Sequence, residues 1–178
     1  MKYLSIISLS VLITVAGCTR LEPKLYSDLT TANAYSTESD INAALVGVYA
    51  DLNPYPGDAW MYYAGYLVMT TDYSTDMGFS TAAGDPTKMS NFTYDDNNRY
   101  IRYNWQYMYN VISNVNLLLS KIEGVQMDET KKKRIIGQAR FLRALAYRDI
   151  TDAWGPAPLY TKVVAPEETV NAALAPVA

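Results

Sequence analysis

The sequence contains no histidine and only one cysteine. Without histidine, the chain has no imidazole to ligate zinc or act as a general base, and it cannot form a Ser-His-Asp triad. One cysteine excludes a disulfide framework within the chain. Positive charge is also scarce, because 15 Lys and Arg stand against 18 Asp and Glu, for a net charge of -3. Nucleic acid is therefore not an expected partner, since phosphate binding calls for clustered Lys and Arg.

Apolar residues and tyrosine are abundant by contrast. The 178 residues are 49% hydrophobic and 19% charged, which suffices for one globular domain with a core. The 16 tyrosines supply wide amphipathic surfaces at low entropic cost, which suits stacking on flat partners such as sugar rings. The alternative is that most of them pack at the rim of the core.

The first residues have the pattern of a secretory leader. Residues 1–17, "MKYLSIISLSVLITVAG", join one Lys to an apolar stretch that ends in small residues, which predicts a signal peptide. The stretch "VAGC", ending at Cys18, resembles the lipobox of bacterial lipoproteins, in which the cysteine is lipidated. A lipid on Cys18 would anchor the protein to a membrane without a spanning helix. The alternative is a buried, unpaired cysteine in the core. Residues 18–37 are then a polar tether, and residues 38–178 are the folded domain.

Helical periodicity and capping signals predict three helices. The first spans residues 37–52, with a capping box formed by Thr37 and Asp40, and the Pro- and Gly-containing residues 53–57 end it. The second spans residues 98–123, with Gly124 as its C′ residue. The third is capped by Asp128 and runs to residue 154, before "GPAP". The short connection between the second and third helices predicts an antiparallel hairpin. The predicted fold class is mainly α, built of helical hairpins with long irregular loops.

The region between the first and second helices is less regular. Residues 60–69, "WMYYAGYLVM", fit a buried helix or a strand, and a helix is favoured. The residues after them are rich in Ser, Thr, Gly and Asp, which predicts a loop.

The charged residues of the third helix allow a binding or a structural interpretation. The run "KKKR", from Lys131 to Arg134, is interpreted as a solvated helix face rather than an anion site. Arg148 is spaced to pair with Asp152, and a half-buried Arg143 must find a carboxylate or carbonyl partner. Apolar residues on two sides of this helix predict that both sides are covered. Gly155 is expected to end the helix in a left-handed conformation.

Several motifs follow one another along the chain: the lipobox, the tether "LEPKLYSDLT", the helices "INAALVGVYADL" and "NWQYMYNVISNVNLLLSKIEG", and the stretch "QARFLRALAYRDITDAWGPAPL". This ordered set resembles the N-terminal region of the SusD/RagB-like outer-membrane lipoproteins. Their pattern is an Ala-Arg-Phe-x-Arg-Ala helix followed by an aromatic residue, Gly and a Pro-Leu pair. It is matched here by Ala139, Arg140, Phe141, Arg143, Ala144, Trp154, Gly155, Pro158 and Leu159.

The resemblance implies a fold with tetratricopeptide-like helical hairpins on a lipoprotein of the outer membrane that faces the cell exterior. It implies capture of a nutrient, usually an oligosaccharide, for a TonB-dependent, SusC-like transporter, with no catalysis, cofactor or metal. Two alternatives are a lipid-anchored glycan hydrolase that lacks its catalytic half and a helical scaffold lipoprotein that binds no ligand. Gln138 departs from the family's usual Glu. The chain resembles only the first third of a family member, so the domain is expected to be incomplete, as a fragment or a truncated product.

Candidate ligand residues lie in the aromatic and polar window of residues 60–85. Sugars present apolar C–H faces rimmed by hydroxyls, so their sites need flat aromatic side chains with polar groups at the edges. The alternative for each residue is simple loop packing. The predicted ligand residues are Trp60, Tyr63, Asp72, Tyr73, Asp76 and Phe79. The residues assigned a structural role are Arg140, Arg143, Trp154 and Gly155. The spacing of the acidic residues does not match a calcium loop, and no metal site is expected.

Overall fold

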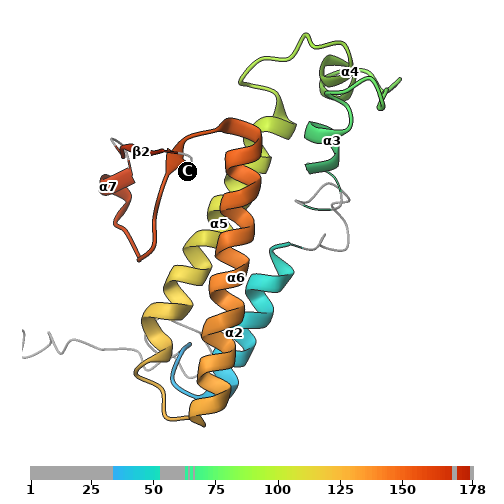
Figure 1. Ribbon diagram of the computed structural model, residues 1–178. Coiled ribbons are helices and arrows are strands. Elements are labelled where there is room, and N and C mark those ends of the chain that lie inside the picture. The colour runs from blue at the N-terminus through green and yellow to red at the C-terminus, as the bar shows by residue number, and fades with distance from the viewer. Residues whose placement is uncertain (1–33, 53–62, 64, 66, 170–171, 177–178) are drawn as a thin grey trace, which may run out of the picture. The chain divides into compact units, whose positions relative to one another are not determined.

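The computed structural model describes residues 34–52, 63, 65, 67–169 and 172–176, which belong to one compact unit (Figure 1). The predicted signal peptide, Cys18 and most of the tether lie outside the described residues, as does Trp60. The elements in chain order are α2 (Glu38–Ala50), α3 (Leu67–Thr71), α4 (Asp85–Ser90), α5 (Arg99–Ile122), α6 (Glu129–Trp154), β1 (Ala157–Pro158), α7 (Pro166–Thr169) and β2 (Leu174–Ala175). The mainly α fold is therefore confirmed.

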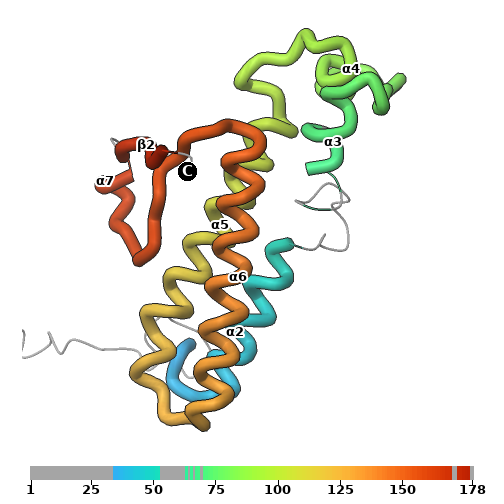
Figure 2. The backbone as a smooth tube through the Cα atoms, in the orientation of Figure 1, coloured from blue at the N-terminus to red at the C-terminus, as the bar shows by residue number. Residues whose placement is uncertain are grey.

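The two long helices α5 and α6 form the predicted antiparallel hairpin, and α2 packs against both (Figures 1 and 2). Local caps fix where each helix begins. The Asn98 side chain accepts a hydrogen bond from the Tyr100 backbone N–H at 3.0 Å, and the Asp128 side chain accepts one from the Lys131 N–H at 2.9 Å. These bonds satisfy backbone donors that have no partner within the helix.

The predicted capping box of α2 is present. The Asp40 backbone N–H donates to Thr37 Oγ1 at 3.2 Å, and Asp40 Oδ2 accepts from the Thr37 N–H at 2.8 Å. The side-chain hydrogen bond with Thr37 lowers the pKa of Asp40, because it favours the ionised carboxylate. The box therefore defines the start of α2 through residues that are close in the sequence.

The core lies where the three helices meet. Each helix turns one apolar stripe inward, so the buried residues recur at helical spacing. The buried side chains of this core are Ile41, Leu45, Val48, Met108, Val111, Ile112, Val115, Leu118, Ile122, Val125, Ile135, Ala139, Leu142, Ala146, Ile150 and Ala157. The expectation that α6 is covered on two sides is wrong, because the Phe141 side chain is 64% exposed. Both α2 and α5 contact α6, whose buried residues recur on one face.

Polar side chains hold the segment after α6 against the hairpin. Asn116 Nδ2 donates to the carbonyl oxygens of Tyr160 and Lys162, both at 3.0 Å. Arg143 Nη1 donates to Asn116 Oδ1 at 2.6 Å and to the Thr161 carbonyl at 2.8 Å. The prediction that Arg143 finds a carbonyl partner is confirmed. Asn116 and Arg143 together form what we call the polar bridge between the hairpin and residues 160–162.

A tyrosine pair reinforces the polar bridge. The Tyr109 hydroxyl donates to the Pro158 carbonyl at 2.8 Å, and the Tyr160 backbone N–H donates to the Tyr147 hydroxyl at 2.6 Å. Burial raises the pKa of Tyr109 and also that of Tyr147. The strand β1 is thereby placed to pair antiparallel with β2, with Ala157 opposite Ala175.

Three expectations about the charged and terminal residues of α6 need correction. Arg148 bonds to its neighbour Asp149 rather than to Asp152. Lys132, one member of the predicted solvated run, is buried and its Nζ lies 3.7 Å from Glu129 Oε1, whereas the rest of the run is exposed. Gly155 has the expected positive φ of 74°, but its ψ of -136° lies outside the left-handed helical region. Only glycine adopts that combination without strain.

Candidate ligand-binding site

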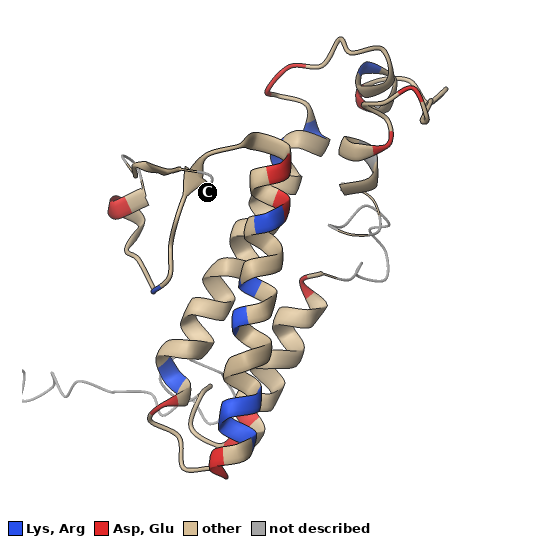
Figure 3. Ribbon diagram, viewed as in Figure 1, with Lys and Arg blue, Asp and Glu red and all other residues tan. Residues whose placement is uncertain are grey.

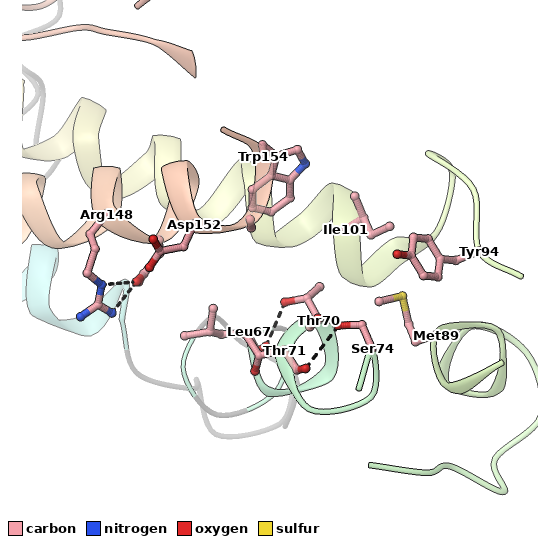
Figure 4. A pocket seen from close by; sticks show the side chains of 12 residues that line it. Leu67, Thr70, Thr71, Ser74, Met89, Tyr94, Ile101, Arg148, Asp152 and Trp154 are labelled. Carbon is pink, nitrogen blue, oxygen red and sulfur yellow. Dashed lines mark hydrogen bonds and ion pairs between the residues drawn. The ribbon is translucent and has the colours of Figure 1, made fainter. Parts of the chain in front are cut away.

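A pocket of about 660 Å³ lies at the end of the hairpin where α6 stops, between that end, α3 and the residues around α4 (Figure 4). Its size is in the range of small-molecule sites. Segments that are far apart in the sequence line it together. The lining residues are Leu67, Thr70, Thr71, Ser74, Met89, Tyr94, Ile101, Arg148, Asp149, Asp152, Ala153 and Trp154.

One side of the pocket is aromatic and apolar. Trp154, on the last turn of α6, is held in place by an edge-on contact with Trp105, whose ring centroid lies 5.5 Å away. Trp105 in turn contacts Tyr109, whose ring is tilted by 46° and has its centroid 4.8 Å away. Tyr94 reaches the pocket from the residues after α4, and its side chain is 39% exposed (Figure 4). The pocket therefore combines a rigid indole with an accessible phenol ring.

The last turns of α6 give the pocket a charged side. Asp149 is 4% exposed and accepts a hydrogen bond from Arg148 Nε at 2.8 Å and another from the Tyr63 hydroxyl at 2.9 Å. The hydrogen bond with Asp149 raises the pKa of Arg148. Arg148 thus balances the charge of the Asp149 carboxylate, and both partners fix its position. Asp152, one turn nearer the helix end, is exposed at the pocket.

Hydroxyl groups of α3 form the facing side. Thr70 and Thr71 each donate a hydrogen bond from the side-chain hydroxyl to the Leu67 carbonyl at 2.9 Å, which fixes the orientation of both hydroxyl groups. The fully buried Asn104 of α5 donates from Nδ2 to Thr70 Oγ1 at 2.9 Å. The amide oxygen of Asn104, Oδ1, is also buried and accepts no hydrogen bond from the residues that the structure describes. A buried amide oxygen of this kind is uncommon and lies directly behind the threonine that lines the pocket.

The structure places the predicted ligand residues in different surroundings. Tyr63 contacts the pocket through its hydrogen bond to Asp149. Asp72, Asp76 and Phe79 are exposed on the loop after α3 and do not line the pocket. Tyr73 is half-buried and packs against the small cluster around Met89 and Tyr100. Trp60 lies outside the described residues.

Sequence reasoning missed most residues that line the pocket. Trp154 was assigned only a structural role, and Arg148 and Asp152 were interpreted as a surface pair. A usable signal was present, because Arg148 and Asp152 recur at a spacing of four on the side of α6 away from its buried stripe, next to an aromatic residue at the helix end. Tyr94 and Thr70 gave no such signal, since nothing in their local sequence places them beside α6.

The chemistry of the pocket suits binding. Within the described part of the chain, no cluster of Asp, Glu, Cys and His side chains can hold a metal ion. Among the same residues, no helix is both long and apolar enough to cross a bilayer. The pocket offers aromatic faces beside hydroxyl, carboxylate and guanidinium groups, which is the combination that a polyhydroxylated ligand requires.

The chain is thus an α-helical protein whose long hairpin carries an aromatic and polar pocket at one end. The family model described as "Starch-binding associating with outer membrane" matches residues 21–175. The chain therefore belongs to the SusD-like family.

Individual relatives agree with the family match. The chain is 26% identical over 172 residues to one SusD-like protein of Formosa agariphila, covering 97% of this chain and 34% of that protein. It is 30% identical over 149 residues to a second from the same organism, covering 75% of this chain and 26% of that protein. The chain therefore spans about a third or less of the length of these relatives.

Solved structures of the same family share the fold. A laminarin-binding SusD-like protein superposes with a TM-score of 0.66 at 27% identity, over 80% of this chain and 31% of that one. A SusD-like carbohydrate-binding protein from Bacteroides fragilis superposes with a TM-score of 0.64 at 24% identity, over 80% of this chain and 28% of that one. The predicted resemblance to the N-terminal region of SusD-like proteins is thus confirmed.

Proposed function

We propose that this chain is the oligosaccharide-binding N-terminal part of a cell-surface lipoprotein, and that sugar binds in the pocket at the end of the hairpin. The observation that carries the proposal is the meeting of Trp154 and Tyr94 with Asp152 and Thr70 in one pocket. Sugar rings stack on aromatic faces while their hydroxyls bond to polar groups at the edge. Membership of a family described as starch-binding supports the same ligand class.

We infer that the chain has no catalytic role. The carboxylate of Asp149 is already engaged by Arg148 and Tyr63, which leaves Asp152 as the accessible acid among the pocket residues described. Glycoside hydrolysis uses a pair of carboxyl groups that flank the scissile bond. Turnover of an oligosaccharide by the protein would favour the hydrolase alternative.

Tyr94 provides the sharpest test of the pocket, because it is exposed and its side chain makes no hydrogen bond to the other residues that the structure describes. Tyr94→Ala is expected to weaken oligosaccharide binding about tenfold, the loss typical of an aromatic contact at a binding site. Calorimetric titration with laminarin oligosaccharides measures it. Tyr49→Ala on α2 is a matched control, since the two tyrosines are both 39% exposed. Equal affinity of the Tyr94 and Tyr49 variants would refute the pocket as the site.

The remaining parts of the proposal concern the location and the partner. We propose that a lipid on Cys18 anchors the protein to the outer membrane facing outward, and that it delivers glycan to a TonB-dependent, SusC-like transporter. Cys18→Ser is expected to move the protein from the membrane fraction to the soluble fraction, because the acyl chains are its only anchor in this proposal. Purification from detergent-solubilised outer membranes is expected to bring a transporter with it. The loop residues Asp72, Tyr73, Asp76 and Phe79 remain proposed ligand contacts, as do Tyr63 and Trp60, of which Trp60 lies outside the described residues.

A further inference from the structure

The short helix α4 ends in a turn that normally belongs to glycine. The Phe92 backbone N–H donates to the Met89 carbonyl at 3.2 Å, and the Thr93 N–H donates to the Lys88 carbonyl at 3.0 Å. This pair of bonds is a Schellman motif, whose C′ residue must adopt a left-handed conformation. Phe92 occupies that position with a φ of 55°. Among the described residues, it is the only one other than glycine with a positive φ.

A phenylalanine in this conformation costs free energy that a glycine would not. Burial of the ring does not offset the cost, because the Phe92 side chain is 62% exposed. The Phe92 side chain therefore stabilises neither the backbone of the turn nor the core. Strained residues of this kind collect at binding and active sites, where the strain serves to present a side chain.

The place of Phe92 relative to the pocket suggests what the ring contacts. Met89, three residues before it, and Tyr94, two residues after it, both line the pocket (Figure 4). The turn that strains Phe92 therefore joins two lining residues and forms part of the rim. A second exposed ring belongs to the same unit, because the Ser80 N–H donates to Ser90 Oγ at 2.9 Å and so brings Phe79 to the end of α4. Phe79 is 68% exposed.

The charge around this rim narrows the class of ligand. Residues 67–98 carry five Asp and one Lys, so the unit that contains Phe79 and Phe92 is acidic (Figure 3). An acidic surface repels anionic partners at close range. Exposed aromatic rings among carboxylates suit the apolar faces and hydroxyls of a neutral sugar and disfavour uronate or sulfated chains.

We propose that Phe92, presented by its left-handed turn at the pocket rim, stacks on a further unit of a neutral oligosaccharide whose first unit occupies the pocket. This inference rests on the proposed function. It adds Phe92 as a residue that determines specificity, and it specifies that the ligand is uncharged. The site then takes a chain that extends past the pocket rather than a single sugar.

Replacement of Phe92 by glycine separates the binding role from a packing role. Phe92→Gly relieves the strained turn and is expected to unfold at the same temperature as the wild type or higher. The same variant is expected to bind a laminarin hexasaccharide about tenfold more weakly. Phe92→Trp is expected to stay within about twofold of the wild type, because it retains an aromatic face. Phe141→Ala on α6 is the matched control, since Phe141 is 64% exposed and lies outside the pocket, and its affinity is expected to be unchanged.

The measurements are calorimetric titration and thermal unfolding on the full chain in detergent. Hexasaccharide binding by Phe92→Gly within twofold of the wild type would overturn the stacking role, and a lower unfolding temperature would overturn the argument from strain. Binding of alginate, a polyuronate, as tight as that of the hexasaccharide would overturn the neutral class. If Tyr94→Ala loses binding while Phe92→Gly retains it, this inference alone fails. If the wild type binds no oligosaccharide, the proposed function fails together with it.

Discussion

Replacement of Asn116 by leucine tests the polar bridge that holds residues 160–162 against the hairpin. The substitution keeps the approximate size of a side chain that is only 3% exposed, but it removes three hydrogen bonds. Two of them join neutral groups and are worth about 0.5 kcal/mol each, and the third joins the Arg143 guanidinium and is worth about 2 kcal/mol. Arg143 retains its bond to the Thr161 carbonyl. We therefore expect a loss of about 3 kcal/mol in the free energy of unfolding.

Urea unfolding of the full chain measures this loss, and trypsin gives an independent measurement. Lys162 is exposed, and its carbonyl is one of the groups that Asn116 holds, so cleavage after Lys162 requires the segment to open. Loss of the polar bridge is expected to accelerate that cleavage by on the order of a hundredfold. Asn114→Leu is the matched control on the same helix, because Asn114 is exposed and makes one bond, to Asp51 Oδ2 at 2.7 Å. That variant is expected to lose less than about 1 kcal/mol. Equal losses in the two variants, or unchanged cleavage after Lys162, would refute the reasoning.

Two further predictions concern backbone conformation and pH. Gly155→Ala is expected to destabilise the protein by about 1–3 kcal/mol, because an alanine at φ 74° and ψ -136° is strained. Gly137→Ala is expected to stabilise it by about 0.5–1 kcal/mol, because Gly137 lies in the middle of α6 and no atom lies within 4 Å of the added Cβ. Urea unfolding of both variants checks the pair, and a change of the same sign in both would contradict it. Because burial raises the pKa of Tyr109 in the folded protein, the unfolded chain loses this proton first, and stability is expected to fall as the pH rises through about 10, the ordinary pKa of tyrosine. Tyr109→Phe should flatten that fall in unfolding measurements between pH 8 and 11, and a slope as steep as that of the wild type would assign it to other groups.

The helices and their caps were predictable because their signals are local. Thr37 and Asp40 stand three residues apart and satisfy each other's backbone groups, so the start of α2 needs no tertiary information. The same holds for the cap at Asp128 and for the hairpin that follows from a short connection.

The pocket was not predictable in the same way, because it joins segments that the sequence keeps far apart. Tyr63 and Asp149 are separated by 86 positions, and nothing in either stretch specifies the other. Phe92 was missed for a different reason. It stands after the end of α4, at the position where the rule for helix ends expects glycine. The helix has six residues, which are too few to show helical periodicity in the sequence. The positions that escaped prediction are thus those where tertiary contact or local strain overrides the sequence pattern.

The two sides of the pocket differ in how freely their residues can be exchanged. The side made by α6 adjoins the buried stripe, because Asp149, which lines the pocket, is itself buried and directly precedes Ile150 of the core. The side made by Thr71 and Tyr94 is exposed and carries no part of that core. In the proposed site, substitutions at Thr71 or Tyr94 are therefore expected to alter ligand preference at little cost to the fold. Evolution of a new specificity is then expected to change the α3–α4 side, while the α6 side stays constant because the core depends on it.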